Sequence, residues 1–149
     1  MMLNKARQIL QKFYGYEDFR PGQKKVVESL LNRNDTVAIM PTGAGKSICF
    51  QIPALLFEGV TLVISPLISL MKDQVDSLRQ LGIAAVYINS SVSKAQLYKD
   101  LQDISAGFYK IIYIAPERLT SEYLPDSFKN LNISMVAVDE AHCLSQWGH

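Results

Sequence analysis

The sequence predicts an α/β fold, with a mostly parallel sheet flanked by helices, on three observations. Short β-branched, apolar runs alternate along the chain with longer segments of helical periodicity. The runs lack polar alternation, which indicates strands buried on both faces of a parallel sheet. A glycine-bearing loop that ends in Gly-Lys-Ser follows the first run directly, and α/β sheets bind ligands at the carboxyl ends of their strands.

Five runs are predicted as strands: 36–40, 60–65, 84–88, 111–115 and 134–138. The segments between them, and the segment before the first, are predicted as helices. An amphipathic helix is expected at the amino end, in "MMLNKARQILQKFYGY", and another is expected to begin at Pro21. Alternation of this kind favours right-handed crossovers between parallel strands.

Two later helices carry start and stop signals. Ser65 and Pro66 are predicted as the N-cap and first turn of one helix, and Gly82 closes it. Ser93 is predicted to open the next helix. One apolar stripe runs along the first of these helices, formed by Leu67, Leu70, Met71, Val75 and Leu78.

Composition bounds the class of protein. The chain has 149 residues, of which 48% are hydrophobic, and a formal net charge of +1, so any nucleic-acid binding must be local. Cys49 and Cys143 lie outside any CxxC spacing, which indicates two buried thiols rather than a disulfide or a zinc site. No apolar run of about 18 residues and no signal peptide are present, so we expect a soluble intracellular protein.

The loop "MPTGAGKS", Met40–Ser47, has the features of a phosphate-binding loop. Gly43 and Gly45 allow backbone N–H groups to turn inward, and the following helix adds the positive end of its dipole. Lys46 is predicted to reach the β- and γ-phosphates of a nucleotide, and Ser47 to ligate magnesium. The alternative is a glycine-rich turn that ends in Lys-Ser without binding a ligand.

An acidic pair, Asp139 and Glu140, ends the last apolar run. Phosphoryl transfer needs one carboxylate on the magnesium ion and a base that orients the attacking water. Asp139 suits the first role and Glu140 the second, so both, with Lys46, are the candidate catalytic residues of an ATPase. Two adjacent carboxylates on a solvated turn are the alternative.

With these residues in place, the sequence resembles the RecQ family of DNA helicases, within helicase superfamily 2. Five blocks in the family's order carry the resemblance: "YGYEDFRPGQ", "MPTGAGKS", "VISPLISLMKDQV", "YIAPERL" and "DEAHCLSQWGH". The resemblance covers essentially the whole chain. It implies a RecA-like P-loop NTPase lobe, here the amino-terminal part of the first motor lobe, with the second lobe and accessory domains absent from residues 1–149.

The resemblance also implies how ATP and Mg²⁺ are held. Tyr16, Arg20 and Gln23 match positions that recognise adenine, and an amide such as Gln23 can donate and accept at once. The alternative is a helix-capping turn with exposed side chains. Ala44 departs from the glycine of many family members. The matching phosphate-loop residues are Thr42, Gly43, Ala44, Gly45, Lys46 and Ser47, with Ser47 and Asp139 on the metal.

Single-stranded DNA is the second implied ligand. The matching positions are the strand-to-helix turn at Ser65 and Pro66, together with Arg118, Trp147 and His149, while His142 couples the acidic motif to the rest of the motor. Aromatic side chains such as Trp147 stack on bases. The alternatives are ordinary strand-Pro-helix turns, a core tryptophan and a helix-capping histidine.

The resemblance implies an ATP-dependent DNA helicase that translocates 3′ to 5′ on single-stranded DNA, acts at duplex junctions, and serves DNA repair and recombination. We expect residues 1–149 to be a fragment of low stability that does not unwind DNA alone. A bacterial protein would lie in the cytoplasm at the nucleoid and a eukaryotic one in the nucleus, with no membrane partner; the oligomeric state stays open. The alternatives are a superfamily 2 RNA helicase, a restriction-type translocase, or a nucleotide-binding module without motor activity.

Overall fold

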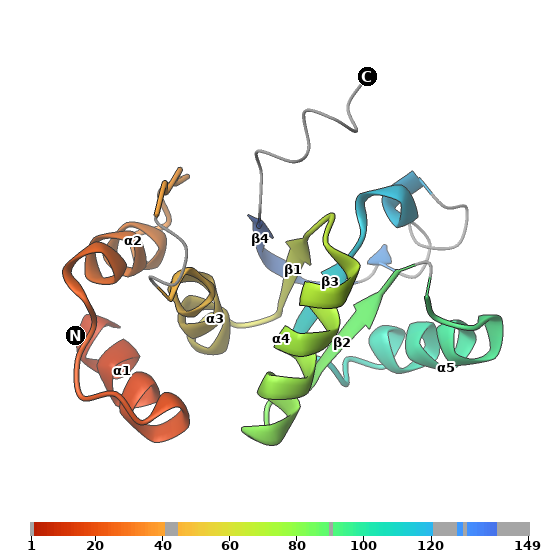
Figure 1. Ribbon diagram of the computed structural model, residues 1–149, viewed down its shortest axis with the longest axis horizontal. Coiled ribbons are helices and arrows are strands. Elements are labelled where there is room, and N and C mark those ends of the chain that lie inside the picture. The colour runs from red at the N-terminus through yellow and green to blue at the C-terminus, as the bar shows by residue number, and fades with distance from the viewer. Residues whose placement is uncertain (1, 41–44, 90, 121–127, 130, 140–149) are drawn as a thin grey trace. The chain divides into compact units, whose positions relative to one another are not determined.

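A computed structural model (Figure 1) describes residues 2–40, 45–89, 91–120, 128–129 and 131–139. The chain divides into two compact units, Met1–Phe57 and Glu58–His149, and each is described by itself. The division separates the residues of the phosphate loop from those of the acidic motif. In the described part of the chain, no helix is long and apolar enough to cross a membrane.

The first unit is helical. Helix α1 (Met2–Ile9) continues into a π-helical turn, η1 (Leu10–Tyr14), and is followed by α2 (Pro21–Leu31) and α3 (Lys46–Leu56). The amphipathic amino-terminal helix and the helix at Pro21 are therefore confirmed. The apolar faces of the three α-helices enclose one core, with fully or nearly fully buried Ala6, Leu10, Phe19, Val27, Ile48 and Ile52.

The second unit holds a parallel sheet of four strands in the order β2-β3-β1-β4. The strands are β1 (Val60–Ile64), β2 (Ala85–Ile88), β3 (Ile111–Ile114) and β4 (Ile133–Val138). Helix α4 (Ile68–Gln80) follows β1, α5 (Lys94–Ser105) follows β2, and the 3₁₀ turn η2 (Pro116–Thr120) follows β3. The predicted α/β class is confirmed, as are the last four predicted strands.

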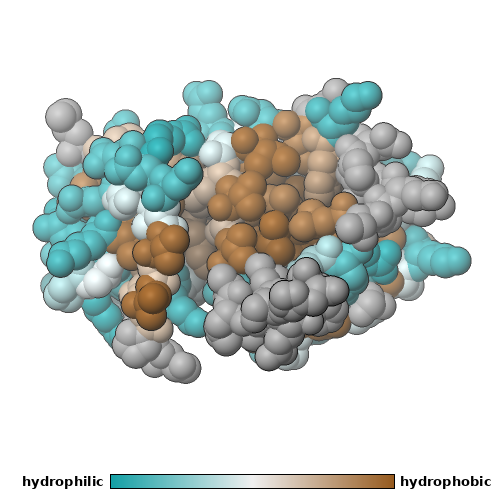
Figure 2. Space-filling model, turned by 90° about the horizontal axis from the view of Figure 1, so that it is seen from above, coloured by the Kyte–Doolittle hydropathy of each residue, from teal (hydrophilic) through white to brown (hydrophobic). Residues whose placement is uncertain are grey.

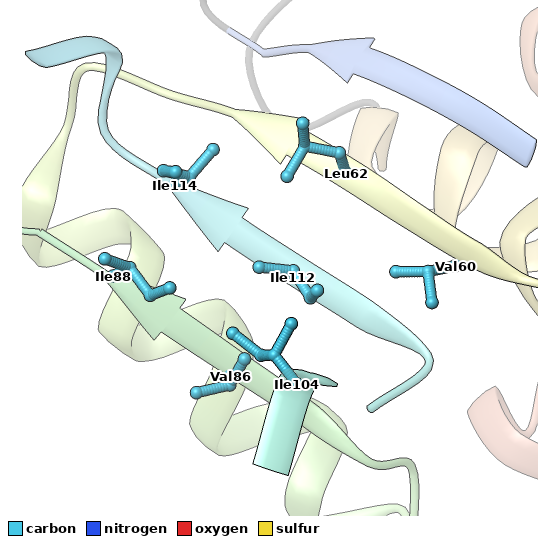
Figure 3. Close-up of a cluster of buried hydrophobic side chains, with 7 residues drawn as sticks. All are labelled: Val60, Leu62, Val86, Ile88, Ile104, Ile112 and Ile114. Carbon is cyan, nitrogen blue, oxygen red and sulfur yellow. The ribbon is translucent and has the colours of Figure 1, made fainter. Parts of the chain in front are cut away.

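The two helices pack on opposite faces of this sheet. On one face, Ile104 of α5 packs against alternate residues of three strands, as Figure 3 shows. Alternation along a strand sends Tyr113 to the other face, where α4 contacts it through Gln74. The cluster in Figure 3 is Val60, Leu62, Val86, Ile88, Ile104, Ile112 and Ile114, and all are buried.

The prediction of a strand at Thr36–Met40 is wrong. This segment has no strand structure, and Val37 and Ile39 are 93% and 96% exposed. Its β-branched composition favours a strand only where a neighbouring strand can pair with it. The described part of the first unit contains helices and no strand, so this segment has no strand to pair with inside its unit.

The predicted start of α4 is also corrected. Leu67, in an extended conformation, is the N-cap residue, and the helix begins at Ile68 rather than at Pro66. The hydroxyl of Ser65 accepts a hydrogen bond from the N–H of Leu67 at 3.3 Å, so Ser65 closes a turn two residues before the helix instead of capping it. The other signals are confirmed: Ser93 caps α5, and Gly82, with φ of +86°, follows α4.

Strand β4 lies at the edge of the sheet and pairs with β1 alone among the described strands. Its side chains are less buried than those of its neighbours, since Val136 and Val138 are 53% and 45% exposed. Figure 2 shows that apolar side chains gather on the face of the molecule that it draws. Asp139 therefore follows the least covered strand of the sheet.

Candidate nucleotide-binding site

The end of the phosphate loop is built by a glycine at the start of a helix. Gly45 is the N-cap residue of α3 and has φ of +70° and ψ of +40°, in the left-handed region. A Cβ added there would collide with Nε2 of Gln23. Glycine is therefore required at position 45 both by the backbone conformation and by the close approach of Gln23.

The amino end of α3 suits an anion. Its N-cap residue, Gly45, makes no side-chain hydrogen bond to the helix. The first turn carries Lys46 and Ser47 and contains no acidic residue. The first backbone N–H groups of a helix have no partner within the helix, and the helix dipole favours negative charge at this end. Helix α5 contrasts with α3, because Ser93 occupies its amino end and accepts from the N–H of Gln96.

Gln23 connects the start of α2 to the phosphate loop. Its Oε1 accepts a hydrogen bond from the backbone N–H of Arg20 at 3.0 Å, and its Nε2 donates to the carbonyl of Gly45 at 3.1 Å. The side chain is buried, at 4% exposure, whereas Tyr16 is 55% exposed and Arg20 is also exposed. Gln23 thus caps a helix, as in the alternative interpretation, but it is not an exposed capping residue.

Helix α3 is held in its unit by a second contact that the sequence did not suggest. The hydroxyl of Tyr14 donates to Oε1 of Gln51 at 2.7 Å, and burial raises the pKa of Tyr14 above its ordinary value. Cys49, on the same helix, is buried, and desolvation raises the pKa of its thiol to about 11. The predicted buried thiol is confirmed for Cys49.

Asp139 lies directly after β4, in the second unit. Its backbone N–H donates to the carbonyl of Ile64 at 2.9 Å, which continues the parallel pairing of β4 with β1. Its carboxylate accepts a hydrogen bond from Nε2 of Gln74 at 3.5 Å, and Oε1 of Gln74 accepts one from the hydroxyl of Tyr113. Three polar side chains, from α4, from β3 and from the residue after β4, are therefore brought together.

The sequence analysis did not single out Gln74. A signal was available, because Gln74 lies three residues after Met71 and four before Leu78, beside the apolar stripe of α4. A polar residue next to a stripe that packs on a sheet is expected to find a buried partner.

Two of the residues predicted to contact DNA, Ser65 and Arg118, make hydrogen bonds within the second unit. Ser65 is 1% exposed and its N–H donates to the carbonyl of Ile114 at 3.2 Å, so the turns after β1 and β3 lie at one edge of the sheet. Arg118 donates through Nη2 to the carbonyl of Asn89 at 3.3 Å and joins the turn after β3 to the loop after β2.

Several predicted site residues lie outside the described residues. These are Thr42, Gly43 and Ala44 of the phosphate loop, and Glu140, His142, Trp147 and His149 after the acidic strand. Among the residues that the structure does describe, no group of three or more His, Cys, Asp or Glu side chains is placed to hold a metal ion. Ser47 lies in the first unit and Asp139 in the second. A hydroxyl and a carboxylate are ligand types that magnesium takes from proteins, with phosphates and water as its other ligands.

Comparison with known proteins identifies the family. The chain matches the DEAD/DEAH box helicase family over residues 20–149. It is 54% identical to ATP-dependent DNA helicase RecQ of Bacillus subtilis and 48% identical to the RecQ protein of Pasteurella multocida, over 99% and 97% of this chain. A protein of Acanthamoeba polyphaga mimivirus, whose name gives ATP-dependent RNA helicase as a provisional activity, is 44% identical over 97% of the chain.

The resemblance to RecQ helicases that the motifs indicate is therefore confirmed. The chain spans about a quarter of the length of these relatives, since the alignments cover 25%, 23% and 26% of them. The match includes Gln23, α3, the whole parallel sheet and the acidic motif. On this evidence the chain belongs to the DEAD/DEAH box helicase family.

Proposed function

We propose that this chain is the ATP-binding part of an ATP-dependent DNA helicase, in which ATP hydrolysis drives movement along single-stranded DNA. The observation that carries the proposal is the amino end of α3, where Gly45 takes a left-handed conformation beside Lys46 and Ser47. That arrangement is what a triphosphate requires of a protein. The names of the RecQ relatives supply the substrate class.

The residues of α3 and of the acidic motif have different proposed roles in ATP binding and hydrolysis. Lys46 neutralises charge on the β- and γ-phosphates, and the backbone N–H groups at residues 42–47 receive the phosphate oxygens. Ser47 and Asp139 would hold Mg²⁺, which would supply positive charge against the phosphates. Glu140 orients the attacking water and accepts its proton.

Adenine recognition is proposed for Tyr16, Arg20 and Gln23. Tyr16 and Arg20 have exposed side chains, and a ring and a guanidinium plane can stack on a base. The amide of Gln23 has four hydrogen-bonding positions, so its bonds to Arg20 and Gly45 are compatible with a further contact to adenine. Because Gln23 also holds Gly45, base recognition would act directly on the conformation of the phosphate loop.

The DNA strand is proposed to cross the carboxyl ends of β1 and β3. Helix α4 begins just after the turn at Ser65 and Pro66, and its amino end, which no side chain caps, offers the N–H groups of its first turn to a phosphate. Arg118 holds the neighbouring loop and supplies positive charge. Trp147 stacks on a base with His149 beside it, and His142 couples the strand to the ATP site. Translocation 3′ to 5′, unwinding at duplex junctions and a role in repair and recombination complete the proposal.

Magnesium-dependent ATP binding by the 149-residue chain tests the nucleotide site. Lys46→Ala and Gln23→Ala should each weaken binding by about tenfold or more, because each removes a charged or buried hydrogen-bonding group. Lys5→Ala, in α1 and outside the proposed site, should bind as the parent chain does. A folded parent chain that does not bind ATP would refute the nucleotide site.

An RNA helicase is the second candidate, favoured by the name of the mimiviral relative. The two candidates differ in the nucleic acid that the protein prefers to bind, DNA or RNA. Displacement of a fluorescent single-stranded DNA by unlabelled DNA, but not by RNA of the same sequence, is the expected result for the DNA helicase. Preferential displacement by RNA would reverse the assignment.

A further inference from the structure

Three side chains at the carboxyl end of the sheet form one hydrogen-bonded series. Tyr113, in β3, is 1% exposed and donates its hydroxyl proton to Oε1 of Gln74 in α4. Nε2 of Gln74 donates in turn to Oδ2 of Asp139, at 3.5 Å. All three residues belong to the second unit, so the series does not depend on the placement of the phosphate loop.

The chemistry of the groups fixes the direction of the series. An amide oxygen only accepts, so the hydroxyl of Tyr113 must donate to Oε1 of Gln74. The amide nitrogen then faces Asp139 and donates to an ionised carboxylate, which only accepts. If the amide turned over, its oxygen would face the carboxylate oxygen and repel it. Asp139 therefore selects the amide orientation, and the hydroxyl of Tyr113 holds it by donating to Oε1.

The series acts on the residue proposed to hold the metal. The backbone of Asp139 is already held by its hydrogen bond to Ile64, so the remaining freedom lies in the side chain. Gln74 engages Oδ2 and thereby directs the carboxylate. Hydrogen bonds to ligating carboxylates orient them and tune the affinity for metal.

We propose that Gln74 is a positioning residue for Asp139, and that Tyr113 positions Gln74 in turn. The inference rests on the proposed ATPase function, because it assigns the two residues to the metal site of that function. Neither side chain touches the metal or the nucleotide. Their effect is to hold the Asp139 carboxylate in the orientation that binds the ion.

Mn²⁺ is the probe, because it replaces Mg²⁺ at oxygen ligands and gives an electron paramagnetic resonance signal. The affinity of the 149-residue chain for ADP is measured with and without Mn²⁺, and the ratio is the metal-dependent gain. Gln74→Met keeps the length and apolar stem of the side chain and removes its hydrogen bonds. It should lower the gain about tenfold, at the lower end of the range for such partners because the contact is long.

The affinity for ADP without metal should not change in Gln74→Met. Gln80→Met is the matched control, an exposed glutamine at the end of the same helix, and should leave both affinities unchanged. A purely structural role would lower thermal stability and weaken ADP binding with and without metal alike. That pattern would overturn the proposal.

Tyr113→Phe tests the direction of the series, with Tyr87→Phe in the neighbouring strand as its control. Tyr113→Phe should lower the metal-dependent gain severalfold although Tyr113 does not touch Asp139. In the Gln74→Met background it should have no further effect on the gain. Additive effects of the two changes would show that Tyr113 does not act through Gln74 and would overturn that part of the proposal.

The outcomes separate the inference from the function on which it rests. If the parent chain folds and shows no metal-dependent gain, the proposed function fails and the inference fails with it. If the parent shows the gain and Gln74→Met keeps it, only the inference is overturned. If Gln74→Met does not fold, the NMR signals of the Gln74 side-chain amide in the parent chain give the test. These signals should shift when ADP binds with Mg²⁺ in place of Mn²⁺, and they should also shift in Tyr113→Phe. Unchanged signals would refute the series.

Discussion

Replacing Gly45 with alanine should damage the phosphate loop through two separate costs. The left-handed conformation of Gly45, with φ of +70°, costs a residue with a Cβ about 1–2 kcal/mol. The new Cβ would also collide with Nε2 of Gln23, and moving that amide breaks its bond to the Gly45 carbonyl. A lost bond with a buried group left unpaired adds about 1–3 kcal/mol, so the total is about 2–5 kcal/mol.

Urea unfolding followed by far-ultraviolet circular dichroism measures this loss, with Gly15→Ala as the control. Gly15 lies in the same unit and has φ of +77°, but a Cβ there meets nothing within 4 Å. Gly15→Ala should therefore cost only the conformational part, about 1–2 kcal/mol. In a Gln23→Ala background the cost of Gly45→Ala should fall to that value. Equal losses for Gly45→Ala and Gly15→Ala in the parent chain would refute the reasoning.

Three further predictions concern the core, a helix cap and a thiol. Ile112→Ala should lower the free energy of unfolding in urea by about 2–5 kcal/mol, because Ile112 lies in the buried cluster. Val136 is half-exposed, so Val136→Ala should lower it by less than about 1 kcal/mol. Similar losses for the two variants would contradict the assigned core. Ser93→Ala should cost about 1 kcal/mol and speed amide exchange in α5, since Ser93 accepts from its first turn; unchanged exchange would exclude the cap. In a Cys143→Ser background, alkylation of Cys49 at pH 8 should be about 100-fold slower than in the urea-unfolded chain, because burial raises the pKa of the thiol to about 11 from an ordinary 9.0. The free energy of unfolding should also fall as pH rises from 9 to 11. Equal alkylation rates would contradict burial of the thiol.

Local signals predicted most of the second unit. Its four strands were predicted correctly because each is a short apolar run rich in β-branched residues, which suits a parallel sheet in which β1 and β3 have neighbours on both sides and the edge strands β2 and β4 on one. The start of α5 was found because Ser93 caps it through its own side chain, which is a contact of near neighbours in sequence. Both kinds of signal are visible within a few residues of the chain.

The errors arose where a local signal depends on a distant partner. Thr36–Met40 has the composition of a strand, yet strand propensity measures fit to a sheet and becomes structure only when a ladder is present. At the start of α4, Ser65 and Pro66 have the residue types of a cap and a first turn. The parallel pairing of Ser65 with Ile114 extends the sheet register to that residue, so the helix begins after it.

The candidate site shows the same division between what is local and what is not. Residue types and spacing predict Gly45 and Asp139 as site residues, because those types at those positions are typical of phosphate and metal binding. Their supports were beyond reach of the sequence alone. Gln23 contacts Gly45 across 22 positions of the chain, and Gln74 contacts Asp139 across 65. Nothing in the sequence separation of these pairs distinguishes Gln23 and Gln74 from exposed glutamines.

The two supports share one chemical logic, which explains the residue type at both positions. In each, the amide oxygen accepts from a donor: the N–H of Arg20 for Gln23 and the hydroxyl of Tyr113 for Gln74. The amide nitrogen is thereby aimed at an acceptor in the site, the carbonyl of Gly45 or the carboxylate of Asp139. A glutamate has the same shape and could accept from the same donors, but its second oxygen would face another acceptor. Only a side chain that accepts at one end and donates at the other can hold these groups in place.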